Sequence, residues 1–504
     1  MIRQTNRNLS PKFDAFDYQE QAVDFIKNLE YGGIFHEQGL GKSKIAIDLI
    51  LYWLKNDIVD VVILVAKKGL VENWKRELSS HSFLTPRVIN SDIKNNFHTF
   101  TSSNKVILTH YEAIKFERER VELFIKSRRV AIILDEATKI KNPGAELSSI
   151  FHELAPLFSK RIILTGTPVA NRPYDLWSQI YFLDLGKSLG DDFEAFRKLH
   201  NLDNKLGDKP DGRTYVISNS SNQGREDFEN AISSIQKKIS GFSIRENKQS
   251  KYVKLPEKII KNIITDWEAA QKLLYEKYRD ELGATISKNG EELDDDAEEI
   301  IKRLLRLVQI ASNPALVDDS YTNQPGKLKA LLELVHEIIS KNEKLIIWSL
   351  FTDNVNYLAN ILKEFNTVRI HGKLSMEERN NSVDKFLGVP DCKILIATPG
   401  AAKEGLTLTV ANHAIFFDRG FSLDDYLQAQ DRIHRVSQSK ICYVYNLIMR
   451  DSVDEWLDDL LEAKKLAAQL AQGDISLAEY RSKATYSFAE LLHKVLNINK
   501  LEKK

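Results

Sequence analysis

Cysteine is almost absent from this chain. Only Cys392 and Cys442 occur among 504 residues, and neither belongs to a CxxC pair or lies beside a cluster of histidines. Disulfide frameworks and the common zinc modules are therefore excluded. No apolar run approaches the roughly 20 residues that cross a bilayer, and the polar start of the chain has no signal core. We therefore expect a cytoplasmic protein without a membrane segment.

Net charge is missing as well, because 71 basic and 71 acidic residues cancel. No global field attracts nucleic acid to such a chain, so any binding surface must come from local separation of charge. Neutrality by itself neither supports nor excludes a DNA partner. The length of 504 residues suffices for roughly three domains, and a hydrophobic content of 43% provides for real cores.

Short apolar runs rich in β-branched residues alternate with stretches of helical spacing in two parts of the chain. This alternation is typical of a doubly wound parallel sheet whose strands are buried on both faces. We therefore predict an α/β protein with two such lobes. The first set of predicted strands lies at residues 34–35, 61–65, 106–109, 131–134 and 161–164, and the second at 344–348, 368–370, 394–397, 414–417 and 443–447.

The region between the two sets reads as mostly helical, with a polar interruption at 201–225, and the residues after 461 are rich in alanine, leucine and lysine at helical spacing. We predict four parts in chain order. They are an ATP-binding lobe at 1–190, a helical insertion and linker at 191–323, a second lobe at 324–460, and a C-terminal helical brace at 461–504.

A phosphate-binding loop is predicted where the first strand meets a helix. Its residues are Gly39, Leu40, Gly41, Lys42 and Ser43. The glycines let backbone N–H groups approach the phosphates, the lysine reaches the β and γ oxygens, and the serine hydroxyl is a ligand for Mg²⁺. This string predicts ATP as the substrate.

An acidic pair, Asp135 and Glu136, directly follows the apolar run at 131–134. The end of a buried strand is where a nucleotide hydrolase needs a magnesium ligand and a residue that orients the attacking water. We assign Asp135 to Mg²⁺ and Glu136 to the water.

Two arginines, Arg432 and Arg435, stand one turn apart in the string from Gln428 to Arg435, far downstream of the loop. On a helix, side chains at i and i+3 face the same way, and both guanidinium groups can fork onto phosphate oxygens. We predict that these arginines, with Gln428, join Lys42 and the acidic pair in catalysis. Hydrolysis would then depend on closure of the two lobes.

These motifs resemble those of superfamily-two helicase-like ATPases, and specifically of Swi/Snf-type DNA translocases, over nearly the whole chain. His36 stands where the family usually has aspartate, and Thr138 where it usually has histidine. The strings that carry the resemblance lie at 16–19, 36–43, 66–77, 135–143, 164–171, 371–375, 397–409 and 428–438.

The resemblance implies tandem RecA-like lobes and several further roles. Gln19 would read the adenine base, and Thr165, Gly166 and Thr167 would couple the state of the phosphates to closure. Trp74 has the alternative role of a core residue. The DNA contacts implied by the resemblance are Lys67, Lys68, Trp74, Asn142, Gly372, Lys373, Thr398 and Lys403.

The function predicted from these features is an ATP-dependent motor that moves along double-stranded DNA, with ATP and Mg²⁺ as its cofactors. Single-stranded DNA is a second possible track, and a separate protein would supply targeting. A strand-separating DNA or RNA helicase and a nucleic-acid-binding scaffold with an inactive ATPase are the alternatives. The chain has the compact build of a phage or bacterial member, and we expect a monomer.

Overall fold

The structure is a computed structural model that describes most of the chain. Among the described residues, no helix combines the length and the apolar character that crossing a membrane requires. The described residues are 9–90, 93–169, 173–200, 207–208, 214–215, 222–248, 255–288, 297–401, 408–435 and 438–483.

The chain forms two compact units. Unit 1 comprises residues 1–200, 230–254 and 470–474, and unit 2 comprises 201–229, 255–469 and 475–504. The insertion predicted at 191–323 is therefore shared between the two units. The four-part division of the chain stays a prediction.

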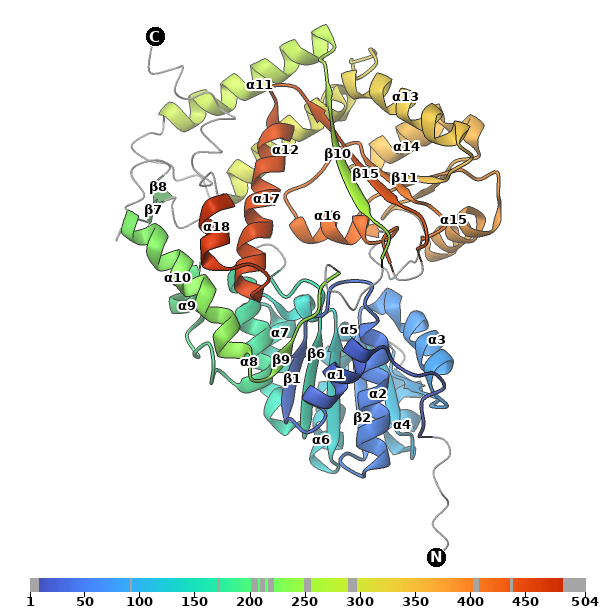
Figure 1. Cartoon of the computed structure of the whole chain (residues 1–504), viewed down its shortest axis with the longest axis vertical. Coiled ribbons are helices and arrows are strands. Elements are labelled where there is room, and N and C mark those ends of the chain that lie inside the picture. The colour runs from blue at the N-terminus through green and yellow to red at the C-terminus, as the bar shows by residue number, and fades with distance from the viewer. Residues whose placement is uncertain are drawn as a thin grey trace, which may run out of the picture. The chain divides into compact units, whose positions relative to one another are not determined.

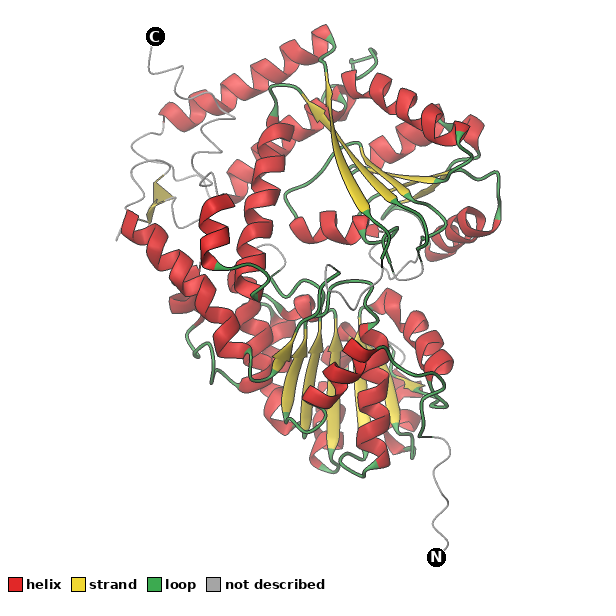
Figure 2. Cartoon of the chain, viewed as in Figure 1, coloured by secondary structure: helices red, strands yellow, loops and turns green. Residues whose placement is uncertain are grey.

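Unit 1 is built on a seven-stranded sheet in which every neighbouring pair is parallel. The five strands predicted for the first lobe are confirmed, and two short edge strands join them (Figure 2). In spatial order the strands are β3 (Arg87–Val88), β4 (Val106–His110), β2 (Val61–Ala66), β5 (Val130–Asp135), β6 (Lys160–Leu164), β1 (Tyr31–Ile34) and β9 (Ser243–Ile244).

Helices cover both faces of this sheet, because side chains alternate between the faces along each strand. Val62 and Leu64 of β2 pack into one apolar core with α1 (Asp17–Ile26), α2 (Lys42–Lys55) and α3 (Val71–His81) (Figure 1). On the other face, α5 (Tyr111–Phe116) contacts β4, and α8 (Trp177–Asp184) contacts β6 and β1. Unit 1 also contains α4 (Ile93–Thr101), α6 (Arg118–Lys126), α7 (Glu146–Leu154), α9 (Phe193–His200) and residues 230–239 at the end of α10 (Asn222–Ile239).

Unit 2 contains a six-stranded parallel sheet, and all five strands predicted for the second lobe are confirmed. The first strand of the sheet lies in the region that was predicted to be mostly helical, and that prediction is wrong for residues 258–265. In spatial order the strands are β10 (Lys258–Thr265), β15 (Cys442–Met449), β14 (His413–Phe416), β11 (Leu345–Trp348), β13 (Ile394–Ala397) and β12 (Val368–Ile370).

The edge strand β10 pairs with β15 along its whole length, from Lys258 opposite Cys442 to Thr265 opposite Met449. Its sequence, Lys-Ile-Ile-Lys-Asn-Ile-Ile-Thr, is rich in the β-branched residues that favour strands. Most of its residues are partly or fully exposed. The polar residues on this edge strand obscured the apolar run on which strand prediction depends.

The two faces of the second sheet pack against different helices. Side chains of α13 (Gly326–Ser340) and α14 (Thr352–Ile361) form one core, and side chains of α15 (Met376–Gly388) and α16 (Leu423–Gln430) contribute to the other. A further cluster joins α11 (Ala269–Lys288), α12 (Ala297–Ser312) and α17 (Val453–Gln472). The remaining elements are α10 (Asn222–Ile239), α18 (Leu477–Lys483), β7 (Gly207–Asp208) and β8 (Thr214–Tyr215).

Helix α17 starts at Val453, before the brace predicted from residue 461 onward, and that brace stays a prediction. The segment 470–474 at the end of this helix belongs to unit 1. There Arg245 donates from Nε and Nη2 to the two carboxylate oxygens of Asp474 at 2.7 and 2.6 Å. A two-bond arginine–carboxylate pair fixes direction as well as distance, so it anchors this segment firmly.

Candidate nucleotide site and nucleic-acid contacts

The predicted phosphate loop lies between β1 and α2. Gly39 and Gly41 have φ angles of 87° and 72°, in the left-handed region that side chains disfavour. Gly41 is the residue immediately before α2, so the loop leads directly into the N-terminal end of that helix. The N-terminal ends of helices favour anions, because backbone N–H groups and the helix dipole point toward them. The local structure that a phosphate cradle requires is therefore present.

Lys42 is the first residue of α2, and its ammonium turns back toward the loop. Its Nζ donates to the carbonyl of His36 at 2.9 Å and to the carbonyl of Glu37 at 3.4 Å. His36 is 1% exposed, and burial together with the charge of Lys42 lowers its pKa to about 4. The imidazole is therefore neutral at ordinary pH, and Lys42 keeps its role as the cation of the loop. Ser43 follows it in the first turn of α2.

Gln19 on α1 lies against the same loop and is 4% exposed. Its Nε2 donates to the carbonyl of Leu40 at 3.1 Å, and its Oε1 accepts from the N–H of Phe16 at 3.1 Å. A β-carbon at Gly41 would come within 2.4 Å of the Gln19 amide nitrogen. Gln19 therefore supports the loop, and its predicted contact with adenine stays a prediction.

The acidic pair occupies the carboxyl end of β5, as predicted. Burial and the neighbouring charge of Glu136 raise the pKa of Asp135. Glu136 has φ of 53°, a strained angle for a residue with a side chain. Its Oε1 accepts from Gln38 Nε2 of the phosphate loop at 3.3 Å. This hydrogen bond brings the loop and the acidic pair into direct contact across 98 positions of sequence.

Trp74 on α3 does not lie where a DNA contact would need it. Its side chain is 2% exposed, and its indole Nε1 donates to Asp135 Oδ2 at 2.7 Å. A side chain so deeply buried cannot reach a phosphate backbone, so the structure contradicts the DNA contact predicted for Trp74. The structure favours the alternative role of Trp74 as a core residue. The indole N–H also has a polar role, because it holds one oxygen of the predicted magnesium ligand.

The string predicted to couple the phosphates to closure packs on the loop. Thr165 is fully buried and its Oγ1 accepts from the N–H of Thr167 at 3.2 Å. A β-carbon at Gly166 would lie 2.6 Å from Gln38 Cγ and 3.2 Å from Lys42 Nζ. Only glycine allows this close approach. The string therefore lies directly against the phosphate loop. Its role in coupling the state of the phosphates to closure stays a prediction.

The residues at this edge of the sheet suit Mg²⁺ in donor type. Within the described part of the chain, no group of three or more histidine, cysteine, aspartate or glutamate side chains could hold a metal ion. Magnesium at nucleotide sites needs only one or two protein ligands, because phosphates and water complete its oxygen shell. The hydroxyl of Ser43 and the carboxylate of Asp135 have this donor chemistry, and their role as Mg²⁺ ligands stays a prediction.

In unit 2, the two arginines are not on a helix. Helix α16 ends at Gln430, and turns at 431–433 and bends at 434–435 follow it. The premise that both arginines lie on a helix is therefore wrong, because α16 has ended and the N–H groups of Arg432 and Ile433 bond three residues back, as in turns. Arg432 is 3% exposed and Arg435 is partly exposed. Gln428 is on the helix, where its Nε2 donates to Asp424 at 2.7 Å.

The other predicted DNA contacts differ in exposure. Lys67 is partly exposed, Lys68 is exposed, and Asn142 is exposed with its Oδ1 accepting from the N–H of Gly144. Lys403 lies outside the described residues. In unit 2, Gly372 and Lys373 are exposed after β12, whereas Thr398 is 8% exposed.

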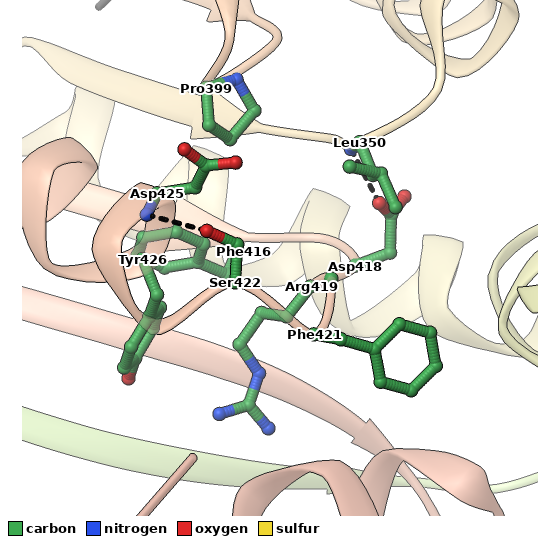
Figure 3. A pocket seen from close by; sticks show the side chains of 10 residues that line it. Leu350, Pro399, Phe416, Asp418, Arg419, Phe421, Ser422, Asp425 and Tyr426 are labelled. Atoms are coloured by element: carbon green, nitrogen blue, oxygen red, sulfur yellow. Dashed lines mark hydrogen bonds between the residues drawn. The ribbon is translucent and has the colours of Figure 1, made fainter. Parts of the chain in front are cut away.

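A cavity of about 260 Å³ lies at the carboxyl ends of β11, β13 and β14 in unit 2 (Figure 3). Ligands of open α/β sheets bind at this edge. Leu350 and Tyr426 provide apolar walls, and the buried Asp418 accepts from the Leu350 N–H at one side. Pro399, from the string predicted to contact DNA, lines the same cavity. This cavity could not be predicted from the sequence, because its walls come from separate parts of the chain: Leu350, Pro399 and the stretch 416–426.

Two contacts around the acidic pair went unnoticed in the sequence. No role is predicted from the sequence for Gln38 in the string 36–43, and for Trp74 only a DNA contact or a place in the core. Both residues lie inside strings that the resemblance had already marked, which indicated that they matter. Their partners in the acidic pair could be named only once β1, β2 and β5 were placed in one sheet.

A phosphate loop and an acidic pair at the carboxyl edge of one parallel sheet, with a second parallel sheet in the same chain, define a helicase-type ATPase with tandem RecA-like units. The sequence matches the SNF2-related domain over residues 18–316 and the helicase conserved C-terminal domain over residues 326–437. The chain therefore belongs to the SNF2-related family of ATP-dependent helicases and translocases.

The chain is similar to several known proteins. It is 28% identical over 500 residues to a putative ATP-dependent helicase/translocase of Bacillus subtilis (strain 168), covering 94% of this chain and 50% of that protein. It is 26% identical over 473 residues to an uncharacterized ATP-dependent helicase of Mycoplasma pneumoniae, covering 92% of this chain and 43% of that protein. The chain thus spans half or less of the length of these relatives.

Among solved structures, the chain is similar to the Sulfolobus solfataricus SWI2/SNF2 ATPase core in complex with dsDNA. The two are 26% identical, with a TM-score of 0.42, and the match covers 96% of this chain and 97% of that one.

Proposed function

We propose that this protein is an ATP-driven motor that moves along double-stranded DNA. The observation that supports this most directly is the hydrogen bond from Gln38 of the phosphate loop to Glu136 of the acidic pair, at 3.3 Å. It joins the two parts that a nucleotide hydrolase must bring together. The DNA part of the proposal rests on the family and on exposed residues such as Lys68 and Lys373 in its DNA-contact strings.

In this proposal the β and γ oxygens of ATP bind Lys42 and the N–H groups of the loop. Ser43 and Asp135 hold Mg²⁺, which supplies neutralising charge to the phosphates when bound. Glu136 orients the attacking water and accepts its proton. Arg432 and Arg435 of unit 2 stabilise the charge that develops on the transferred phosphate, with Gln428 nearby in the same string.

The lysines of the DNA-contact strings bind the phosphates of DNA. Affinity therefore depends little on base sequence and falls steeply with salt. A strand-separating helicase shares all of the ATPase parts and differs only in what happens to the duplex. A scaffold with an inactive ATPase is disfavoured, because the loop lysine and both acidic residues are present and well placed.

The test compares ATP turnover with double-stranded DNA, single-stranded DNA and RNA at equal nucleotide concentration. We expect the largest stimulation with duplex DNA, a decline with added salt, and no turnover in Lys42→Ala. Equal stimulation by RNA would overturn the assignment to duplex DNA. A strand-displacement assay then separates translocation from unwinding, and displacement of a paired strand would favour the helicase alternative.

A further inference from the structure

Lys67, in a segment predicted to contact DNA, lies beside Glu136, the residue proposed to orient the attacking water. Lys67 Nζ is 3.9 Å from Glu136 Oε2. Lys67 is the first residue after β2, and Glu136 is the first residue after β5. The two strands are parallel neighbours with Val65 opposite Leu134, so their carboxyl ends bring these two side chains to the same place.

This ion pair is weak enough to be exchanged. A separation of 3.9 Å is too long for a hydrogen bond. The Oε2 atom of Glu136 is buried and accepts no hydrogen bond from any described residue, whereas Oε1 accepts from Gln38. The Lys67 side chain is 23% exposed and that of Glu136 is 14% exposed. Lys67 is therefore the cation that balances Glu136 Oε2, and it also faces solvent.

We propose that Lys67 transmits DNA binding to the ATPase site: it restrains Glu136 when DNA is absent, and it leaves Glu136 when a DNA phosphate binds its ammonium. This inference rests on the function proposed above. A carboxylate that has lost its neighbouring cation can turn toward the attacking water and orient it. Phosphate competes well for a lysine ammonium, which binds it as a compact point charge. ATP turnover is then slow when no DNA is bound.

Thermodynamic linkage makes the proposal testable without nucleotide. If DNA must take Lys67 away from Glu136, then removing the charge of Glu136 must strengthen DNA binding by the same free energy. We expect Glu136→Gln to bind a fluorescent DNA duplex about two- to fivefold more tightly than the wild type, measured by anisotropy in nucleotide-free buffer at low salt.

This gain must depend on Lys67. In the Lys67→Gln background, adding Glu136→Gln should leave DNA affinity unchanged, because no ion pair remains to be broken. An equal gain in both backgrounds would mean that Glu136 simply repels DNA, and it would overturn the proposal.

ATP turnover provides the second test. Lys67→Gln should raise turnover without DNA several-fold and reduce the ratio of DNA-stimulated to basal turnover, whereas Lys67→Arg should keep both near the wild-type values. Lys75→Gln is the matched control, since Lys75 lies on the adjoining helix α3 and pairs with the exposed Glu72 at 2.6 Å. Thermal unfolding of every variant checks that each one folds.

Lys68→Gln separates loss of a phosphate contact from release of Glu136. It should shift the DNA titration to higher DNA concentration while the plateau of turnover stays the same. Unchanged basal turnover in Lys67→Gln, with unchanged DNA affinity in Glu136→Gln, would overturn the inference alone if wild-type turnover is still stimulated by DNA. A wild-type protein that neither binds DNA nor responds to it would overturn the proposed function, and the inference with it.

Discussion

At the scale of a single residue, Trp74 shows that one buried polar atom can connect the core to the predicted metal ligand. A tryptophan inside a core has to satisfy its indole N–H, and here the acceptor is the carboxylate predicted to hold Mg²⁺. The same contact favours the charged form of Asp135 against the burial that raises its pKa. Packing and the proposed metal binding therefore depend on the same side chain.

We predict that Trp74→Phe raises the Mg²⁺ concentration needed for half-maximal ATP turnover by about tenfold, because the phenyl ring fills the site but holds no oxygen of Asp135. Titration of turnover with Mg²⁺ measures this. Trp53→Phe is the control, since Trp53 is fully buried and its Nε1 donates to the Lys27 carbonyl at 2.8 Å, away from the acidic pair. Equal shifts in both variants would show a general effect of losing a buried indole.

At the scale of elements, three segments meet at the carboxyl edge of the first sheet: the phosphate loop, the turn after β5, and the string after β6. The strand order β5-β6-β1 makes their ends neighbours. Gly166 sets the distance between the last of these strings and the loop, because its backbone touches Gln38. We therefore predict that a change in one string is transmitted to the others by direct contact.

We expect Gly166→Ala to weaken ATP binding at least tenfold while costing about 1–3 kcal/mol in free energy of unfolding. The new methyl group would lie 2.6 Å from Gln38 Cγ and 3.0 Å from the Gln38 backbone nitrogen, so the loop that carries Lys42 must move. Titration with a fluorescent ATP analogue and urea unfolding measure the two effects. Gly241→Ala, where the methyl group meets nothing within 4 Å, should bind the analogue normally. Normal ATP binding in Gly166→Ala would contradict the coupling of the two strings.

At the scale of the whole molecule, the residues proposed to be catalytic are divided between the units. Lys42 and the acidic pair belong to unit 1, and Arg432 and Arg435 belong to unit 2. The segment 470–474, at the end of a helix that begins in unit 2, is anchored in unit 1 by the Arg245–Asp474 pair. The chain thus returns to unit 1 at residues 470–474, between two segments of unit 2.

We predict that Arg432→Ala and Arg435→Ala keep ATP affinity but lower turnover on the order of 10³-fold, because arginines that act on the transferred phosphate contribute to the transition state and little to substrate binding. Fluorescent-nucleotide binding and steady-state turnover separate the two effects. Arg450→Ala is the control, since Arg450 is an exposed residue of unit 2 that pairs with Asp266 at 3.0 Å. Normal turnover in both Arg432→Ala and Arg435→Ala would refute the assignment.

The sequence by itself determined the class of fold and the order of the chemical groups. Buried parallel strands are nearly continuous apolar runs, and the glycines of a phosphate loop and the acidic pair after a strand are local patterns. Residues 61–65 and 131–134 were therefore readable as strands, and Lys42, Asp135 and Glu136 as members of an ATPase site, before any contact was known.

Only the tertiary structure decided which of these groups touch. It placed β2 beside β5, which brought Trp74 to Asp135 and Lys67 to Glu136. It also added β10 to the second sheet and ended α16 before Arg432. The physical reason is that periodicity reports how a segment relates to its own faces, whereas strand order and the exact end of a helix depend on packing against residues far away in the chain.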